Sequence, residues 1–242
     1  MDETEQIISE LRSLSTEEKR RVLPQFFKTG PGEYGEGDKF LGVTVPLTRS
    51  VARAHRQADS AVLDRLLGSP WHEARLCALL IMVAQAAKAD ELRRKELYDF
   101  YLAHTGSINN WDLVDLSAPA IVGGHLADKP RNALYSLAES TCLWENRIAV
   151  VSTIAFIRNG ELDDTYRLAS ALMGHKHDLM HKACGWMLRE AGKRDPARLV
   201  AYVEKNSAAM PRTMLRYAIE RLAPDERRRL MALKPKKDRQ NH

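Results

Sequence analysis

Two tryptophans stand one helical turn from a charged side chain, and this pairing is the feature of the sequence that most directly suggests chemistry. Trp111 precedes Asp115 by four residues, and Lys182 precedes Trp186 by four residues. Residues four apart lie on one face of a helix, so each pair offers an aromatic ring beside a charge. A lone tryptophan in a helix is usually a packing residue. Two such pairs are harder to assign to packing alone.

Other common chemistries lack the spacing that they need. The sequence has no Gly-x-Ser-x-Gly motif, which would expose a serine nucleophile at a sharp turn. The three cysteines, Cys77, Cys142 and Cys184, form no close pair. They support neither a disulfide framework nor a cysteine zinc site, and we expect them to be buried and reduced.

The glycine-rich segment at residues 30–35 matches the pattern G-x-G-x-x-G of dinucleotide-binding proteins. That function requires a preceding strand, whereas the sequence predicts a helix there. The loop also contains Glu33, Glu36 and Asp38, which would repel a pyrophosphate. We expect a structured entry loop that presents Tyr34.

His177 and His181 have the spacing of the two zinc ligands in a zinc-protease helix. An aspartate, Asp178, stands where such a helix places its general-base glutamate, and no third ligand is obvious beyond His175. We therefore predict no metal site and interpret these histidines as surface residues of a helix.

Amphipathic helices are expected to position all of these residues, because apolar side chains recur at helical spacing and no segment alternates as a strand would. A capping box at residues 15–18 predicts the start of a helix that carries Phe26 and Phe27. Ser69 predicts an N-cap before Pro70. Further helices are predicted at 90–104, 108–122, 131–140, 145–158, 162–173, 178–191, 196–204, 211–222 and 225–232.

These helices show a weak sequence repeat. In four of them, a basic residue comes directly before an apolar stretch. The leading residues are 72, 35 and 34 positions apart, and they are Arg75, Arg147, Lys182 and Arg216. One step of 36 from Arg75 reaches Trp111. A unit of about 35 residues with two helices is typical of an α-solenoid. We therefore predict a superhelix of HEAT-like antiparallel helix pairs, with a row of cations along a concave face that binds DNA phosphates. Asp115 would weaken that binding, so we expect it to serve chemistry.

The distribution of charge agrees with a polyanion partner. The net charge of +5 combines +8 over residues 142–242 with −3 over residues 1–40. We predict one HEAT-like domain over residues 1–232 and a basic tail over 233–242. The sequence contains neither a membrane-length apolar run nor a signal-peptide pattern, so we expect a cytoplasmic protein that joins the nucleoid when bound to DNA.

With these motifs, the sequence resembles the AlkD-type DNA alkylation-repair glycosylases, which are all-helical proteins of stacked HEAT-like repeats. The resemblance rests on residues 39–46 (Lys-Phe-Leu-Gly-Val-Thr-Val-Pro), 110–115 (Asn-Trp-Asp-Leu-Val-Asp), Arg147 and 182–190 (Lys-Ala-Cys-Gly-Trp-Met-Leu-Arg-Glu). It implies that Trp111 and Asp115 line the lesion site, with Trp186 as a second aromatic wall. Arg147 would be a cationic contact beside them, and Tyr34 would lie near the N-terminal aromatic contact of the family.

The resemblance also implies a reaction. A purine alkylated at N7 or N3, such as 7-methylguanine or 3-methyladenine, is a cationic leaving group that needs no protonation. Asp115 would stabilise the oxocarbenium ion at C1′ and orient water, and the family is thought to act without turning the base into a pocket. We expect a monomer that binds alkylated duplex DNA and needs no cofactor. The alternatives are a noncatalytic HEAT-like module for branched or damaged DNA and a helical-repeat protein scaffold.

Overall fold

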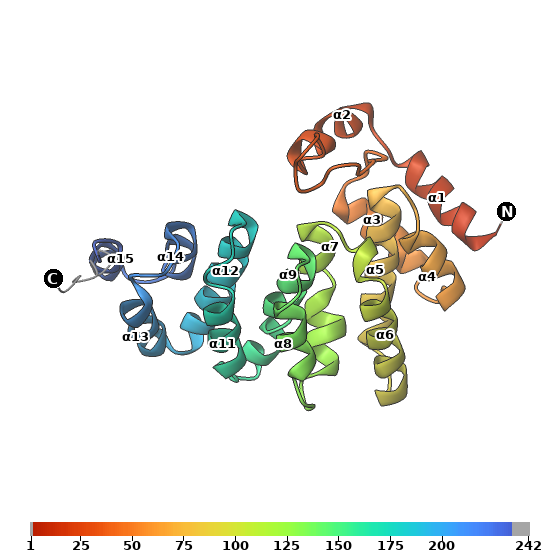
Figure 1. Cartoon of the computed structure of the whole chain (residues 1–242). Coiled ribbons are helices and arrows are strands. Elements are labelled where there is room, and N and C mark those ends of the chain that lie inside the picture. Colours follow the sequence, from red (N-terminus) through yellow and green to blue (C-terminus); the bar gives the residue numbers. More distant parts are fainter. Residues whose placement is uncertain (1, 234–242) are drawn as a thin grey trace. The chain divides into compact units, whose positions relative to one another are not determined.

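The computed structural model describes residues 2–233, and helices joined by loops make up this range (Figure 1). The one extended pairing among these residues is an isolated parallel bridge between Lys39 and Trp71. No helix in the described range is long and apolar enough to cross a membrane. The prediction of an all-α fold is therefore confirmed.

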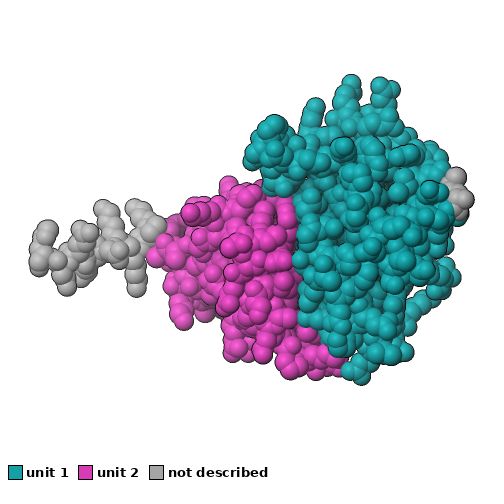
Figure 2. Space-filling view, turned by 45° about the vertical axis from the view of Figure 1, so that its right-hand side comes forward, with its two compact units in different colours: residues 1–125 teal, residues 126–242 magenta. Residues whose placement is uncertain are grey.

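The described residues form two compact units, one up to His125 and one from Leu126 on, which Figure 2 shows in teal and magenta. The prediction of a single domain over residues 1–232 stays a prediction. Of the basic tail predicted at 233–242, all but Leu233 lies outside the described residues.

The first unit is built around α5, which is buried at every position from His72 to Met82. A helix that is buried on all sides needs neighbours all round. These neighbours are α1, α3, α4, α6, α7 and the π-helical turn η2, which all pack on α5. The elements of this unit are α1 (Glu3–Ser13), α2 (Glu17–Phe26), α3 (Val45–Ala54), α4 (Ser60–Leu67), α5 (His72–Ala86), α6 (Glu91–Ala103), η1 (Thr105–Ser107), α7 (Trp111–Asp115) and η2 (Pro119–Gly123).

The second unit is organised around α12, which packs against α9, α10, α11, α13 and α14. Its helices are α8 (Asn132–Ala138), α9 (Leu143–Val151), α10 (Ile154–Arg158), α11 (Asp163–Ala171), α12 (Asp178–Arg194), α13 (Pro196–Asn206), α14 (Arg212–Ala218) and α15 (Pro224–Met231). Successive helices thus pack on one another within each unit, which is the α-solenoid architecture that the repeat predicts.

Gly185 explains how closely two of these helices approach. A Cβ atom at this position would lie 2.5 Å from the Cβ of Tyr217 and 2.6 Å from the carbonyl oxygen of Met214. Any larger residue would therefore force α12 and α14 apart. The glycine in the Lys-Ala-Cys-Gly-Trp motif has a packing role.

Several predicted helix boundaries were wrong. The N-cap of α2 is Thr16 rather than Ser15, and its side chain accepts the Lys19 N–H at 3.3 Å. The helix expected after Ser69 begins only at His72. The segments predicted as single helices at 108–122 and 145–158 are each divided, by α7 and η2 in the first case and by α9 and α10 in the second. Three helices that were not predicted, α1, α3 and α4, complete the first unit.

The four leading cations of the repeat occupy similar places in their helices, within the first five residues of α5, α9, α12 and α14. Their surroundings differ. Arg75 and Arg147 are buried, Lys182 is partly exposed, and Arg216 is exposed. The repeat therefore predicts where each cation lies in its helix, but it does not predict whether the side chain is exposed to solvent.

Candidate functional site

The short helix α7 sets the directions of Trp111 and Asp115. The side-chain oxygen of Asn110 caps its start by accepting the Trp111 N–H at 2.9 Å. Asp112 turns into the protein, where its Oδ1 accepts the Leu113 N–H at 2.9 Å. Trp111 and Asp115 are half-buried, and both line one pocket of the first unit.

This pocket has a volume of about 530 Å³ and largely apolar walls. Phe27 stacks on Trp111 with ring centroids 5.2 Å apart, and it stacks on Phe40 at 5.1 Å. Phe26 meets Trp111 edge-on at 5.9 Å. The lining residues come from α2, the loop after it, α3, α5 and α7, and they are Lys19, Val22, Leu23, Phe26, Phe27, Phe40, Val43, Thr44, Val45, Pro46, His72, Glu73, Leu76, Trp111, Asp112, Asp115 and Leu116.

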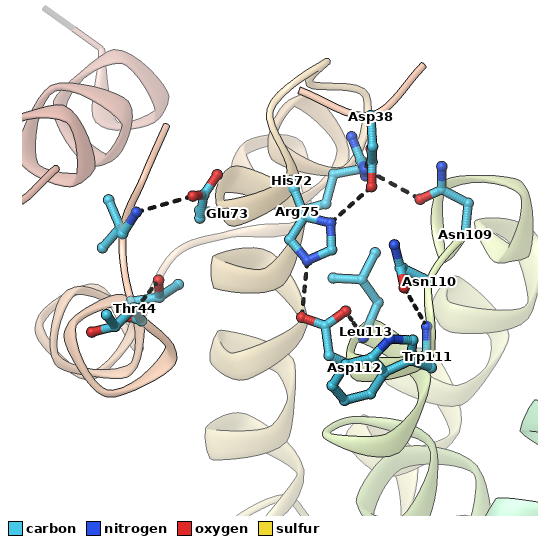
Figure 3. Close-up of polar contacts among 12 residues, drawn as sticks. Asp38, Thr44, His72, Glu73, Arg75, Asn109, Asn110, Trp111, Asp112 and Leu113 are labelled. Atoms are coloured by element: carbon cyan, nitrogen blue, oxygen red, sulfur yellow. Dashed lines mark hydrogen bonds and ion pairs between the residues drawn. The ribbon is translucent and has the colours of Figure 1, made fainter. Parts of the chain in front are cut away.

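Behind the aromatic rings, a buried histidine joins two carboxylates. Figure 3 shows the His72 ring between Asp38 and Asp112. Its Nδ1 lies 2.8 Å from Asp38 Oδ2 and its Nε2 lies 2.9 Å from Asp112 Oδ2. Carboxylate oxygens only accept, so both ring nitrogens donate and the ring is an imidazolium. Burial disfavours that charge, but the two carboxylates outweigh it and raise the pKa of His72 to about 9.

Arg75 completes this buried cluster. Its guanidinium is paired with Asp38, and it also donates to the side-chain oxygen of Asn109 at 3.1 Å and to the Ser69 carbonyl at 2.9 Å. Two cations thus balance the carboxylates of Asp38 and Asp112, which is what makes their burial tolerable. We call these four residues the buried charge quartet. The expectation that Arg75 contacts DNA is corrected, because its guanidinium is enclosed and engaged within the first unit.

A third buried carboxylate, that of Glu73, fixes the segment that leads into α3. Glu73 accepts backbone N–H groups from Leu41 at 2.8 Å, Gly42 at 2.8 Å and Val43 at 3.0 Å. Gly42 in turn accepts the Thr16 N–H at 3.0 Å through its carbonyl group. The stretch at 39–46 therefore connects α5 to α2 and places Phe40 in the pocket wall.

The entry loop is a structured turn. The carboxylates of Glu33 and Glu36 accept the backbone N–H groups of Gly30 and Gly32, both at 2.9 Å. These acids are used within the loop, whereas Asp38 reaches the buried charge quartet. Tyr34 is half-buried and is not among the residues that line the pocket. Its contact with DNA stays a prediction.

The other predicted site residues belong to the second unit. Arg147 is buried on α9, and its Nη1 donates to the Leu179 carbonyl in the first turn of α12 at 2.7 Å. Lys182 lies 2.9 Å from Asp178 on α12, and Trp186 is half-buried one turn later. Arg216 is exposed on α14.

The histidines near residue 177 help to begin α12. His177 is its N-cap, and the Nδ1 atom of His177 accepts the Leu179 N–H at 3.2 Å. The Nδ1 atom of His175 accepts the His177 N–H at 3.0 Å. Within residues 2–233, no group of three or more histidine, cysteine, aspartate or glutamate side chains is arranged to hold a metal ion.

The sequence argument identified Trp111 and Asp115 but missed the residues that support them. His72, Asp38, Asp112 and Glu73 were not recognised as a group. A signal was present, because His72 and Glu73 open a segment that is otherwise apolar through Met82 apart from Arg75. Charged residues at the start of a buried helix must be paired, and that requirement could have identified them.

The fold and the pocket together define a helical-repeat protein with an aromatic, acid-lined site in its first unit. The family model described as DNA alkylation repair enzyme matches residues 7–222, so the chain belongs to this family of DNA repair enzymes. The resemblance that the motifs indicated is therefore confirmed for the family.

Comparison with solved structures supports the fold. A protein from Enterococcus faecalis, described as a predicted DNA alkylation repair enzyme, is similar with a TM-score of 0.66 and 14% sequence identity. The match covers 87% of this chain and 97% of that protein. Among curated proteins, none matches the chain at a significant level.

Proposed function

We propose that this protein is a DNA glycosylase that removes cationic alkylated purines, such as 7-methylguanine and 3-methyladenine, from duplex DNA. The observation that supports this proposal best is that Trp111 and Asp115 line one pocket, in a chain of the DNA alkylation repair enzyme family. The pocket combines an aromatic surface for the purine with a carboxylate for the charge that develops on the sugar.

The reaction is a hydrolysis. The bond between C1′ and the purine nitrogen breaks, its electron pair goes to the purine, and the purine loses its positive charge. Water adds its oxygen to C1′, and its proton passes to Asp115 or to solvent. A carboxylate about 4 Å from the oxocarbenium ion contributes about 4 kcal/mol at an effective dielectric of about 20. That energy corresponds to about a thousandfold in rate if it acts only in the transition state.

The remaining predicted residues are assigned to DNA binding in this proposal. Lys182 and Arg216 have accessible charges for phosphates. Trp186 is assigned to the lesion, and Tyr34 keeps the contact that the resemblance implied. Arg147 is as buried as Arg75 and donates to the Leu179 carbonyl, so this proposal does not use it as a phosphate contact. Arg75 is not assigned to DNA, because it belongs to the buried charge quartet.

Replacing Asp115 by asparagine tests the catalytic assignment. Asp115→Asn keeps the shape of the side chain and removes its charge, so release of 7-methylguanine from alkylated duplex DNA should fall about a thousandfold. DNA binding should be retained. The measurement is a single-turnover release assay beside a binding titration.

The control is Asp99→Asn, which removes an exposed carboxylate of α6 that pairs with Lys95. It should release the base at the rate of the unchanged protein. Full activity of Asp115→Asn would refute the role of this carboxylate.

A salt titration separates the enzyme from the noncatalytic alternatives. A DNA-binding protein loses affinity steeply as salt rises, whereas a protein scaffold binds duplex DNA weakly even at low salt. Steep salt dependence without release of any cationic lesion would favour the noncatalytic DNA-binding module.

A further inference from the structure

The helix that carries Trp111 and Asp115 is too short to fix its own direction. It has five residues, whereas isolated helices shorter than about 12–15 residues are marginal in water. The directions of the two site residues therefore depend on contacts between α7 and the rest of the first unit. These contacts matter for catalysis, because a displacement of about 1 Å at a reacting group costs about a hundredfold in rate.

Two cations of α5 hold the segment that contains α7 (Figure 3). The Nε2 atom of His72 donates to Asp112 Oδ2 at 2.9 Å, within the helix itself. The guanidinium of Arg75 donates to the side-chain oxygen of Asn109 at 3.1 Å, just before the helix begins. The segment is thus tied to α5 at two separate points.

A single carboxylate, that of Asp38, orients both of these cations. Its Oδ2 accepts from His72 Nδ1 at 2.8 Å, and its Oδ1 accepts from the Arg75 guanidinium. The side chain of Asp38 is 2% exposed, and Asp38 is not among the residues that line the pocket. Any effect of Asp38 on the site must therefore pass through the side chains that it orients.

We propose that Asp38 is a positioning residue, which fixes α7 through His72 and Arg75. In this role it sets the directions of Trp111 and Asp115 for the reaction. This inference rests on the proposed function and deepens it, because it names a residue that controls the rate from outside the pocket. Its physical basis is that the two oxygens of one carboxylate orient two cations, and each cation reaches a different point of the α7 segment.

The link through His72 depends on pH. The charged residues that bond to His72, neighbour it on α5 or line the pocket with it are Lys19, Asp38, Glu73, Arg75, Asp112 and Asp115. Its ring donates to Asp38 and Asp112, and a neutral imidazole has one donor, so loss of the proton releases one of these two carboxylates. Burial lowers the pKa of His72, but the carboxylates of Asp112 and Asp38 raise it to about 9. The rate of base release should therefore fall as the pH rises through about 9.

A charge-balanced double variant separates positioning from stability. Asp38→Asn combined with Arg75→Gln removes the link to Asn109 but strands no buried charge, so it should be more stable than either single variant. Its single-turnover release of 7-methylguanine at saturating protein should be at least about tenfold slower, because α7 loses hydrogen bonds that involve charged groups. Its affinity for duplex DNA should be retained. Release at the unchanged rate overturns the inference.

The matched control is His55→Gln, because His55 also joins two carboxylates in the first unit. Its Nδ1 lies 3.1 Å from Glu3 Oε1 and its Nε2 lies 3.2 Å from Glu10 Oε2, so it links the end of α3 to α1. His55→Gln should destabilise the protein and keep both the release rate and its dependence on pH. A fall in rate as large as that of the double variant would assign the effect to general destabilisation and overturn the inference.

The pH profile of release gives a second readout. The unchanged protein and His55→Gln should both lose activity as the pH rises through about 9. His72→Gln should release the base slowly at every pH and should not show this fall, because its side chain does not titrate. An alkaline fall that persists in His72→Gln overturns the inference.

Hydrogen exchange distinguishes failure of this inference from failure of the proposed function. The Leu113 N–H is bonded to Asp112 Oδ1 and the Val114 N–H to the Asn110 carbonyl, so both report on the order of α7. Both should exchange faster in the double variant than in the unchanged protein or in His55→Gln. Exchange at the unchanged rate overturns the inference and leaves the glycosylase standing. Faster exchange, in a protein whose unchanged form releases no base, supports the link between Asp38 and α7 and refutes the glycosylase.

Discussion

His72 makes the stability of the first unit depend on pH. Its pKa is about 9 in the folded protein and 6.5 for an ordinary histidine, so the folded state holds the proton more tightly. A group with a raised pKa stabilises the fold fully below about pH 6.5, and this contribution is lost as the pH rises through about 9. A shift of this size corresponds to on the order of 3 kcal/mol.

Chemical denaturation at a series of pH values measures this effect. The free energy of unfolding should fall by on the order of 3 kcal/mol between about pH 6.5 and 9. His72→Gln should be less stable at neutral pH, and its free energy of unfolding should change much less over this pH range. His104→Gln, which removes a more accessible histidine at the end of α6, should keep it. A pH dependence that is the same in His72→Gln and in the unchanged protein would contradict the assignment.

Asp38 contributes at the opposite end of the pH range. Burial raises the pKa of its carboxyl group, but hydrogen bonds and charge from His72 and Arg75 outweigh burial and lower it. The stabilisation from a lowered pKa is present above the ordinary value and is lost as the pH falls through the folded value. The buried charge quartet is therefore most stabilising between the ordinary pKa of an aspartate, 3.8, and that of a histidine, 6.5.

Gly42 links the chemistry of the pocket to the position of a whole helix. Its φ angle is +92°, and a Cβ atom there would lie 2.7 Å from both the Arg20 nitrogen and the Thr16 carbonyl oxygen. Because α2 carries Val22 and Phe26, this close approach fixes part of the pocket wall.

We expect Gly42→Ala to destabilise the protein and to slow release of 7-methylguanine from alkylated duplex DNA. Gly37→Ala is the matched control, because Gly37 has a similar φ of +83° but no atom within 4 Å of an added Cβ. Both substitutions strain the backbone, so their difference isolates the displacement of α2. Denaturation should show Gly42→Ala to be less stable than Gly37→Ala by about 2 kcal/mol. Equal stability would show that the contact with α2 is unimportant.

The helices differed in how well the sequence predicted them. The predicted ranges of α6, α12 and α13 agree with the structure to within three residues, because their polar and apolar positions alternate at helical spacing. The segments that form α7 and η2 were read as one helix, although Pro119 follows α7 closely. Their division depends on tertiary packing against α5 and α6, which no local pattern reports.

The candidate site was predictable only in part for a related reason. Trp111 and Asp115 are four residues apart, so one helix brings them together. The contact between Asp38 and His72 spans 34 residues, and that between His72 and Asp112 spans 40. Only the folded chain brings these groups together.

At the scale of the whole molecule, the structure is needed to tell which positive charges are available to bind DNA. The four cations at equivalent repeat positions suggested a continuous contact with phosphates. Arg75 and Arg147 are both buried, whereas Lys182 and Arg216 have accessible charge. A buried cation stabilises the fold, whereas an exposed cation releases counterions from DNA.

The salt dependence of DNA binding separates these roles. Arg216→Gln should lower the slope of log affinity against log salt by about 0.9, the value for one phosphate contact. Arg75→Gln should leave the slope unchanged and should reduce the free energy of unfolding by about 3–5 kcal/mol, because it leaves the buried charge quartet with one uncompensated negative charge. The measurements are binding titrations at several salt concentrations and chemical denaturation. The opposite pattern would restore Arg75 as a DNA contact.

The buried charge quartet also restricts how this sequence can drift over generations. Its members come from the entry loop, α5 and α7, and their charges balance. Loss of one member strands a buried charge, whereas loss of an opposite pair keeps the interior neutral. Substitutions at these positions are therefore expected to occur in compensating pairs. Asp38→Asn, for example, should be tolerated only together with a change such as Arg75→Gln. Exposed surface residues can vary one at a time, whereas the members of the buried charge quartet must change together.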